Sequence, residues 1–294
     1  MQSVSTTNQP VLTMNTTLLA LAILPVIVLG FYVYRKDRFQ KEPVGMLLKA
    51  FFMGCLSVVP AILLEQSLTM LYQPVSEAFS PAVGGLYTGF VVAGCSEELC
   101  KLLLLSWAVW RSRHFDEYFD GIVYATFVSL GFAGVENVMY VFSAETYSHA
   151  IMTGSMRAIL SVPAHFLFGV AMGYFFALAK FDPSHRGANL FKAFLVPMLL
   201  HGTFDSLLMV PAAMGEDGGA LTGVLFIAFI IFDIKLWKSG MKKLRELQDL
   251  SGYQAADSAY DTYNETYSSG SDDTWRQTDN DRDSKPFDGF NWDV

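Results

Sequence analysis

Two adjacent glutamates and a nearby lysine, Glu97, Glu98 and Lys101, lie near the middle of a long apolar stretch of the chain, Gly84 to Trp110. An ionisable side chain at the centre of a membrane helix costs about 2.5–3.5 kcal/mol on insertion scales, so three of them within about one and a half turns indicate a function. Helical spacing places Lys101 between the two glutamates, where it can pair with either of them.

This trio contains the residue types that acid–base hydrolysis requires. Lys101 favours the ionised form of the glutamate it pairs with, whereas burial beside a like charge favours the protonated form of the other. One base next to one potential acid suits hydrolysis. The competing interpretation is a structural ion pair inside the membrane, although a single Glu–Lys pair would be enough for that role.

A second apolar stretch carries the pattern Phe132-x-x-x-Glu136-Asn137-x-x-Tyr140. Phe132, Glu136 and Tyr140 share one helix face, so Tyr140 is placed to donate a hydrogen bond to Glu136. A satisfied packing network would use the same residues, so this motif alone is compatible with a structural or a functional role.

Two histidines occupy the next two apolar stretches. Gly169 and Gly173 follow His165 on one face, and small residues at that spacing let another helix approach closely. His201 and Asp205 are four residues apart, so the carboxylate can orient the imidazole ring. A single membrane histidine is often only a helix contact, but two of them with three glutamates at similar depth favour one polar cavity.

The composition is that of a polytopic membrane protein. Of the 294 residues, 52% are hydrophobic and 16% are charged, and the mean hydropathy is +0.33. These values are too apolar for an ordinary soluble domain. The formal net charge of -8 belongs to the C-terminal tail, because twelve Asp/Glu and three Lys/Arg follow from Glu246 onward, whereas residues 1–245 carry a net charge of +1.

We expect an all-α, polytopic membrane bundle of about seven transmembrane helices. A helix needs about 20 apolar residues to cross the hydrocarbon core. The stretches that meet this requirement are Thr16–Tyr34, Met46–Tyr72, Leu86–Trp110, Phe119–Phe142, Ser155–Lys180, Asn189–Val210 and Ala220–Trp237.

The loops between these stretches alternate in charge. Gln73–Gly85, Ser143–Gly154 and Pro211–Gly219 contain no Lys or Arg, and the other connections are basic. The positive-inside rule then predicts an N-terminus outside and a C-terminus in the cytoplasm. In this topology the polar residues named above lie within roughly 8 Å of the membrane midplane. Those that depart from it lean outward, which predicts one cavity opening toward the outer face.

These patterns divide the chain into a short extracytoplasmic N-terminus (1–15), a transmembrane domain (16–240) and an acidic cytoplasmic tail (241–294). The tail is rich in Asp, Ser, Tyr, Asn and Gly and shows no sustained apolar pattern, so we expect it to be disordered. Its aromatic residues could contact a cytoplasmic partner, or the tail could act only as a solubilising segment.

In these motifs the chain resembles the PrsW family of bacterial intramembrane proteases of the glutamic type, and more distantly the CAAX prenyl endopeptidases and the Aph-1 subunit of gamma-secretase. The motifs that carry the resemblance are, in order, Glu97-Glu98-x-x-Lys101, Phe132 to Tyr140, His165 before its glycine face, and His201 with Asp205. The resemblance covers about residues 20–240. It implies a multi-pass protein of the bacterial inner membrane that cleaves a single-pass membrane protein, typically an anti-sigma factor in a stress response.

The resemblance also implies roles for the catalytic residues. Glu97 or Glu98 would activate a water molecule, and Lys101 would tune the pair. His165 and His201 would stabilise the tetrahedral intermediate or bind a metal.

Four further residues would line or support the cavity: Glu136, Asn137, Tyr140 and Asp205. The cofactor is either absent or one divalent metal such as zinc, for which Glu98, His165 and His201 are the candidate ligands. In metal-free chemistry a glutamate is the base, and histidine or asparagine donates to the oxyanion. The sequence favours the metal-free version, because the positive charge of the lysine would repel a cation.

Two other functions use the same residue types. A proton-coupled transporter would use Glu, His and Lys as a proton relay, but the sequence shows no internal repeat of the kind that favours transport. A non-catalytic Aph-1-like scaffold would keep the fold, and the glutamate pair argues against it. No phosphate-binding loop, dinucleotide fingerprint, nucleophile elbow or zinc helix is present, and no basic aromatic surface suggests nucleic acid. The expected partners are therefore the lipid bilayer and a membrane-protein substrate.

Overall fold

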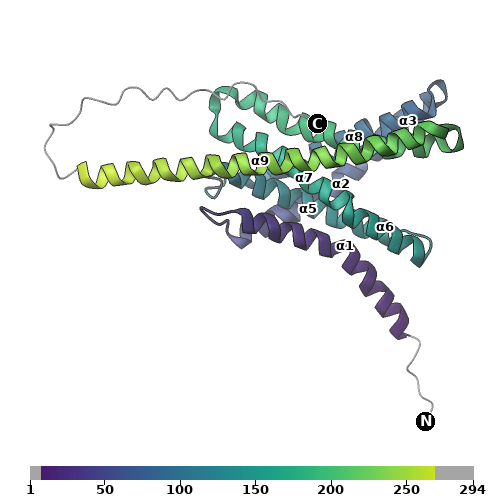
Figure 1. Cartoon of the computed structure of the whole chain (residues 1–294), viewed down its shortest axis with the longest axis horizontal. Helices are drawn as coiled ribbons and strands as arrows, with labels where there is room; N and C mark the ends of the chain where they lie inside the picture. The colour runs from purple at the N-terminus through teal and green to yellow at the C-terminus, as the bar shows by residue number, and fades with distance from the viewer. Residues whose placement is uncertain (1–7, 269–294) are drawn as a thin grey trace, which may run out of the picture.

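The structure, a computed structural model, describes residues 8–268 as a helical bundle, and this part of the chain contains no strand (Figure 1). The helices are α1 (Asn8–Lys36), α2 (Val44–Tyr72), α3 (Pro81–Tyr87), α4 (Ser96–Val109), α5 (Tyr118–Phe142), α6 (Tyr147–Ile159), α7 (Ser161–Phe181), α8 (Arg186–Met214) and α9 (Gly219–Ser268). A π-helical segment, Thr88–Cys95, joins α3 to α4 without a break. The predicted all-α class is confirmed.

Several segments of the described chain are long and apolar enough to cross a membrane. They are Met14–Lys36, Val44–Tyr72, Tyr118–Phe142, Tyr147–Phe181 and Pro183–Tyr263. The last of these contains α8 and most of α9, and the stretch with the glutamate pair is helical from Pro81 to Val109. A multi-pass membrane bundle is therefore supported, while the count of seven and the orientation of the termini stay predictions.

The predicted span from residue 155 to 180 is divided between α6 and α7 at Leu160. Pro163 has no N–H to donate to the carbonyl of Ile159, so a continuous helix cannot pass through this point unperturbed. The break places His165 in the second turn of a new helix.

Helices α5 and α7 form the centre of the bundle, and nearly every residue of α7 is buried. Gly169 and Gly173 allow the two backbones to meet: a Cβ added at Gly169 would lie 2.9 Å from the Cα of Thr126, and one at Gly173 would overlap the carbonyl of Gly121. The prediction that these glycines admit a neighbouring helix beside His165 is confirmed, and that helix is α5.

The prediction of a disordered tail from residue 241 is wrong for residues 241–268, because α9 continues through Ser268 and passes along the bundle (Figure 1). Leu244, Leu247 and Ser251 are buried at a spacing that keeps one helix face against the bundle. The backbone N–H of Phe119 donates to Ser251 Oγ at 2.8 Å. The remainder of the predicted tail, and the first residues of the predicted N-terminal segment, lie outside the described residues.

The connections gather at two ends of the bundle. One end, called the basic end here, carries residues 37–43, 110–117 and 182–185. The opposite end carries residues 73–80, 143–146 and 215–218. Contacts such as Lys180 Nζ to the carbonyl of Trp110, at 2.8 Å, hold the loops of the basic end together.

Candidate active site

The glutamate pair and the lysine form a buried cluster on α4. The ammonium of Lys101 donates to Glu97 Oε2 at 3.1 Å and to Glu98 Oε1 at 2.8 Å. The lysine thus lies between the two glutamates, as predicted, and contacts both of them rather than one. Lys101 and Glu98 are fully buried, whereas Glu97 is 5% exposed. The π-helical segment ends at Cys95, directly before this cluster, and such segments are frequent at functional sites.

His165 on α7 lies between two charged groups from other helices. Its Nδ1 is 3.2 Å from Lys101 Nζ, and its Nε2 is 2.8 Å from Glu136 Oε2. Because an ammonium only donates and a carboxylate only accepts, the consistent tautomer carries the proton on Nε2 and directs the Nδ1 lone pair toward the α4 cluster.

His201 on α8, like His165, has its Nε2 against a carboxylate. Its Nε2 lies 3.3 Å from Asp205 Oδ2, as the spacing of four residues predicts, and its Nδ1 lies 2.9 Å from Glu98 Oε1. The ring of Phe168 stacks on the imidazole with centroids 4.8 Å apart. A hydrogen bond from Nδ1 to Glu98 needs a proton on that nitrogen, because a carboxylate cannot donate.

These groups meet at one place. Glu97, Glu98, His165 and His201 each offer a ligand atom, and these atoms all lie within 4.8 Å of one another. The two imidazole rings are edge to face with centroids 5.1 Å apart. Sequence spacing placed the four residues at similar depth, and the structure brings their side chains into contact.

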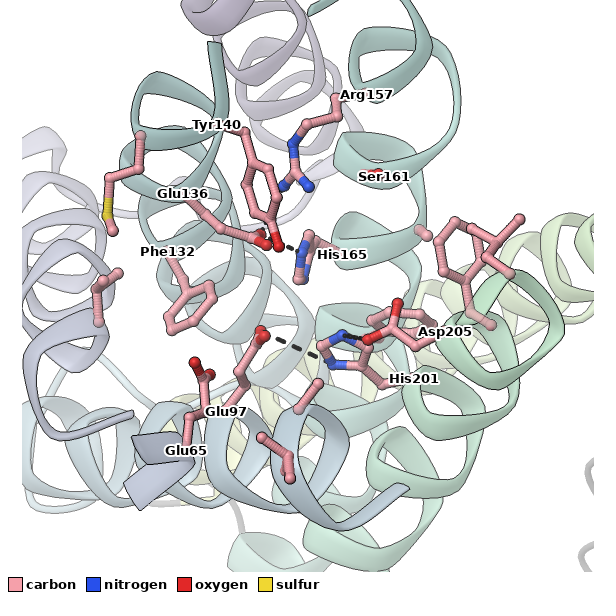
Figure 2. A pocket seen from close by; sticks show the side chains of 18 of the residues that line it. Glu65, Glu97, Phe132, Glu136, Tyr140, Arg157, Ser161, His165, His201 and Asp205 are labelled. Carbon is pink, nitrogen blue, oxygen red and sulfur yellow. Dashed lines mark hydrogen bonds and ion pairs between the residues drawn. The ribbon is translucent and has the colours of Figure 1, made fainter. Parts of the chain in front are cut away.

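A cavity of about 510 Å³ adjoins the cluster. Figure 2 shows Glu97, His165 and His201 pointing into it from three different helices. Glu98 and Lys101 are not among its lining residues and lie behind Glu97. The two glutamates therefore differ: Glu97 can reach a molecule in the cavity, and Glu98 supports the lysine and His201 from behind.

The lining of the cavity continues toward the opposite end of the bundle. It includes Ser143 and Arg157, which lie near the loops of that end, and no residue from the loops of the basic end among the described residues. This agrees with the predicted direction of opening within the bundle, since those loops are the ones that lack Lys and Arg.

Glu136 lines the cavity, as predicted, but its partners differ from those expected. Its Oε2 forms an ion pair with Nη2 of Arg157 at 2.7 Å as well as contacting Nε2 of His165 at 2.8 Å. Tyr140 also lines the cavity, but its ring lies under the guanidinium of Arg157, 4.2 Å from the centroid. The prediction that Tyr140 donates to Glu136 is not borne out among the contacts of the described residues.

Asn137 is not part of the cavity lining, which corrects the prediction that it faces the cavity. One residue along a helix turns the side chain by about 100° from Glu136, and Asn137 is fully buried between helices. Its Nδ2 donates to the carbonyl of Ala22 at 3.0 Å, and its Oδ1 accepts from Arg157 Nε at 2.6 Å. Asn137 therefore orients Arg157 and cannot donate to a substrate oxyanion from this position.

Glu65, which the sequence motifs did not single out, lines the cavity from α2 (Figure 2). The signal was present, because Glu65 is an ionisable residue inside a predicted span, and the cost argument applied to Glu97 applies to it equally. Arg157, which also lines the cavity, is the second residue that the sequence patterns did not single out.

The residues present fit a divalent metal ion. Two histidines and two carboxylates form a donor set that zinc accepts, and each histidine has its Nε2 against a carboxylate, the arrangement that typically orients metal-binding imidazoles. Oε2 of Glu98 is buried without a hydrogen-bond partner in the described structure. The lone pair of His165 Nδ1 can bind either the ammonium of Lys101 or a metal ion, but not both. Metal binding by His165 therefore requires that the Lys101 ammonium give up its contact with Nδ1.

An all-helical bundle with membrane-length apolar helices and a buried Glu–His–Lys site beside a cavity defines a membrane-embedded hydrolase. Comparison with known proteins gives the family. The sequence model described as PrsW family intramembrane metalloprotease matches residues 42–234. The chain therefore belongs to the PrsW family of intramembrane proteases, and the resemblance predicted from the motifs is confirmed.

Individual relatives agree with this assignment. The chain is 40% identical over 240 residues to Protease PrsW of Clostridioides difficile strain 630, covering 81% of this chain and 94% of that protein. It is 33% identical over 240 residues to Protease PrsW of Bacillus subtilis strain 168, covering 81% and 98%. No solved structure matches the chain. The protein is thus a peptidase and a multi-pass protein of bacterial membranes.

Proposed function

We propose that this protease cleaves membrane-anchored proteins with a water molecule that Glu97 activates. The observation that carries the proposal is the difference between the two glutamates: Glu97 lines the cavity, while Glu98 is sealed behind it. A general base must reach the water it deprotonates. Glu97 has that access, and its neighbours Lys101 and His201 can respond to a change in its charge.

In this mechanism Glu97 accepts a proton from water as the water oxygen attacks the peptide carbonyl, and it then returns the proton to the leaving amine. Lys101 supplies positive charge beside Glu97, and buried charges of this kind are effective in a low-dielectric site. Asp205 fixes the ring of His201, and Glu136 fixes the ring of His165.

We further propose that Glu98, His165 and His201 hold a divalent metal ion in the active enzyme. Such an ion supplies a Lewis acid that activates water and polarises the scissile carbonyl. The two carboxylate-backed histidines support this choice over the metal-free version that the sequence alone favoured, as does the description of the family as metalloproteases.

The substrate class that we propose is a single-pass membrane protein cut near the opposite end of the bundle. Apolar side chains such as Ile62, Phe132 and Leu208 line the cavity together with the polar cluster, so a hydrophobic segment can lie against the wall while one peptide bond reaches Glu97. An anti-sigma factor, the substrate that the family resemblance suggests, is the first candidate to assay.

The test is cleavage of tagged single-pass membrane proteins by the full-length protein reconstituted in liposomes. Glu97→Gln should abolish cleavage while the protein still inserts and accumulates. Glu77→Gln is the matched control, because Glu77 is exposed in the loop of the opposite end. Near wild-type turnover by Glu97→Gln would show that another group is the base.

A further inference from the structure

Glu65 is a carboxylate of the peptidase cavity to which the proposed mechanism gives no part. It lies on α2, within a segment that is apolar enough to cross the membrane, and Figure 2 shows it directed into the cavity. Val58 and Ile62 line the cavity from the same helix, and their spacing from Glu65 places all three side chains on one face. The register of a long helix therefore turns the Glu65 carboxylate toward whatever occupies the cavity.

Glu65 differs from the other carboxylates of the cavity lining in its lack of a partner. Each of the other three is paired: Glu97 with Lys101, Glu136 with Arg157 and His165, and Asp205 with His201. Within residues 8–268, no ion pair or hydrogen bond involves Glu65. It interacts with the charges around the cavity only at longer range, and Glu136 and Asp205, which repel it, are among them. Its carboxylate is half-buried, so a molecule in the cavity can reach it.

The cations around the cavity are already engaged by other groups. Arg157 is the one lysine or arginine in the cavity lining among the described residues, and Glu136 and Asn137 hold its guanidinium. Lys101 lies behind the cavity and contacts the two glutamates of α4. An ionisable side chain inside a membrane span is costly, and such residues typically pair with an opposite charge. An incoming molecule with a positive charge would supply the partner that Glu65 lacks.

The wall beside Glu65 suits the side chain of a lysine or an arginine. Ile62 lies one turn before Glu65 and packs against the apolar cluster that contains Val58 and Phe132, and all three of these apolar residues line the cavity. Lysine and arginine bury their methylene stems along apolar surface while the charged head remains at a polar group. The proposed metal ion does not take this place, because the group of possible metal ligands around the histidines does not include Glu65.

We propose that Glu65 determines specificity by pairing with a lysine or arginine of the substrate close to the scissile bond. This inference rests on the proposed function, because it places the substrate in the same cavity. Glu65 and Glu97 interact electrostatically, and they line the cavity from different helices. Charges interact over about 10 Å, a distance that an extended chain covers in about three residues. The basic residue of the substrate therefore lies within about three residues of the bond that is cut.

The experiment measures kcat/KM in liposomes for a cleaved single-pass substrate that carries lysine, methionine or glutamate at each of the three positions on either side of the scissile bond. At one position lysine should raise kcat/KM at least about tenfold over methionine, the lower end of what close charge pairs contribute. Glu65→Gln should bring this ratio to about one, and Glu65→Lys should favour glutamate at the same position. Glu77→Lys, in an exposed loop, is the control and should keep the wild-type ratio. Each ratio is measured within one preparation, so differences in the amount of folded protein cancel.

A binding measurement separates this proposal from the peptidase mechanism. Synthetic single-span peptides of leucine and alanine, with one lysine or one methionine at successive positions, are titrated into full-length Glu97→Gln protein in nanodiscs. The best lysine peptide should bind at least about tenfold more tightly than its methionine counterpart, and Glu65→Gln in the same background should remove the difference.

The proposal is overturned if lysine is preferred at no position in either measurement, or if the preference persists in Glu65→Gln. Cleavage by Glu97→Gln with a preference that still depends on Glu65 would support the specificity role and would overturn only the role of Glu97 as the base.

Discussion

His201 and Glu98 are in contact across two helices: Nδ1 of the histidine lies 2.9 Å from Oε1 of the glutamate. The same carboxylate oxygen is 2.8 Å from the ammonium of Lys101. Glu98 therefore supports two positive or proton-bearing groups at once, while its neighbour Glu97 faces the cavity. Adjacent residues of identical type have different environments, and their substitutions should have different consequences.

Both Glu97→Gln and Glu98→Gln should lose activity, but only the second should also lose much stability. Removing one partner of a buried ion pair leaves an uncompensated charge and costs about 3–5 kcal/mol, and Lys101 depends on Glu98 for its shortest contact. Thermal unfolding in detergent, monitored beside cleavage, separates the two effects. Equal thermal midpoints for the two variants would contradict the supporting role of Glu98.

Metal content should depend on the two histidines. The purified wild-type protein should carry one divalent ion in the cavity, measured by elemental analysis, and His165→Ala and His201→Ala should each lose it. His185→Ala is the control, because His185 is an exposed loop residue. Chelation should abolish cleavage reversibly. Full activity after exhaustive chelation would contradict metal binding and would favour the metal-free mechanism, in which the histidines donate to the oxyanion.

More of the site than of the packing between its helices could be predicted from the sequence. Glu97, Lys101 and His201 were recognisable because ionisable residues are costly inside apolar helices, and helical spacing gave the Lys101 and Asp205 contacts correctly. Contacts between helices were harder. Arg157 meets Glu136 because α6, which ends at Ile159, packs beside α5, and no local spacing encodes that approach.

The error at α9 has a related cause. Composition after Ser251 is polar and acidic, which predicts disorder when the segment is considered alone. In the structure the helix continues because Leu244 and Leu247 pack its preceding turns against the bundle. Ser251 accepts a hydrogen bond from the first turn of α5, and Gln254 donates one to the loop before α5. Tertiary contacts stabilise a helix that its own sequence would not maintain.

Glu136→Gln should reduce turnover about 10–100-fold, the usual effect of losing a carboxylate that orients an active-site histidine. The amide keeps the size of the side chain but weakens the contacts with His165 and Arg157. Because Glu136 acts through His165, the loss should fall mainly on kcat. Glu145→Gln, an exposed loop variant, is the control; unchanged kcat in Glu136→Gln would remove Glu136 from the positioning of His165.

Stability should depend on pH through the basic end. Burial raises the pKa of Glu42 and of Glu117 from the ordinary value of 4.5 to about 7. The folded state then binds more protons than the unfolded state between these values, so the free energy of unfolding falls as pH rises from 4.5 to 7. Glu42→Gln should flatten this part of the profile in metal-free buffer. A variant profile parallel to that of the wild type would mean that Glu42 does not titrate in this range.

The orientation of the bundle can be tested with one pair of single-cysteine labelling sites. Glu77 and Ser184 are both exposed, and they lie at the opposite end and the basic end, respectively. If the positive-inside rule holds, Glu77→Cys should react with an impermeant maleimide in intact cells, while Ser184→Cys should react only after the membrane is permeabilised. The wild-type protein gives the background from its own cysteines. Because the cavity extends toward the end that carries Glu77, the same labelling decides where the substrate is cut. Labelling of Ser184→Cys in intact cells would place the cavity on the cytoplasmic side and invert the predicted topology.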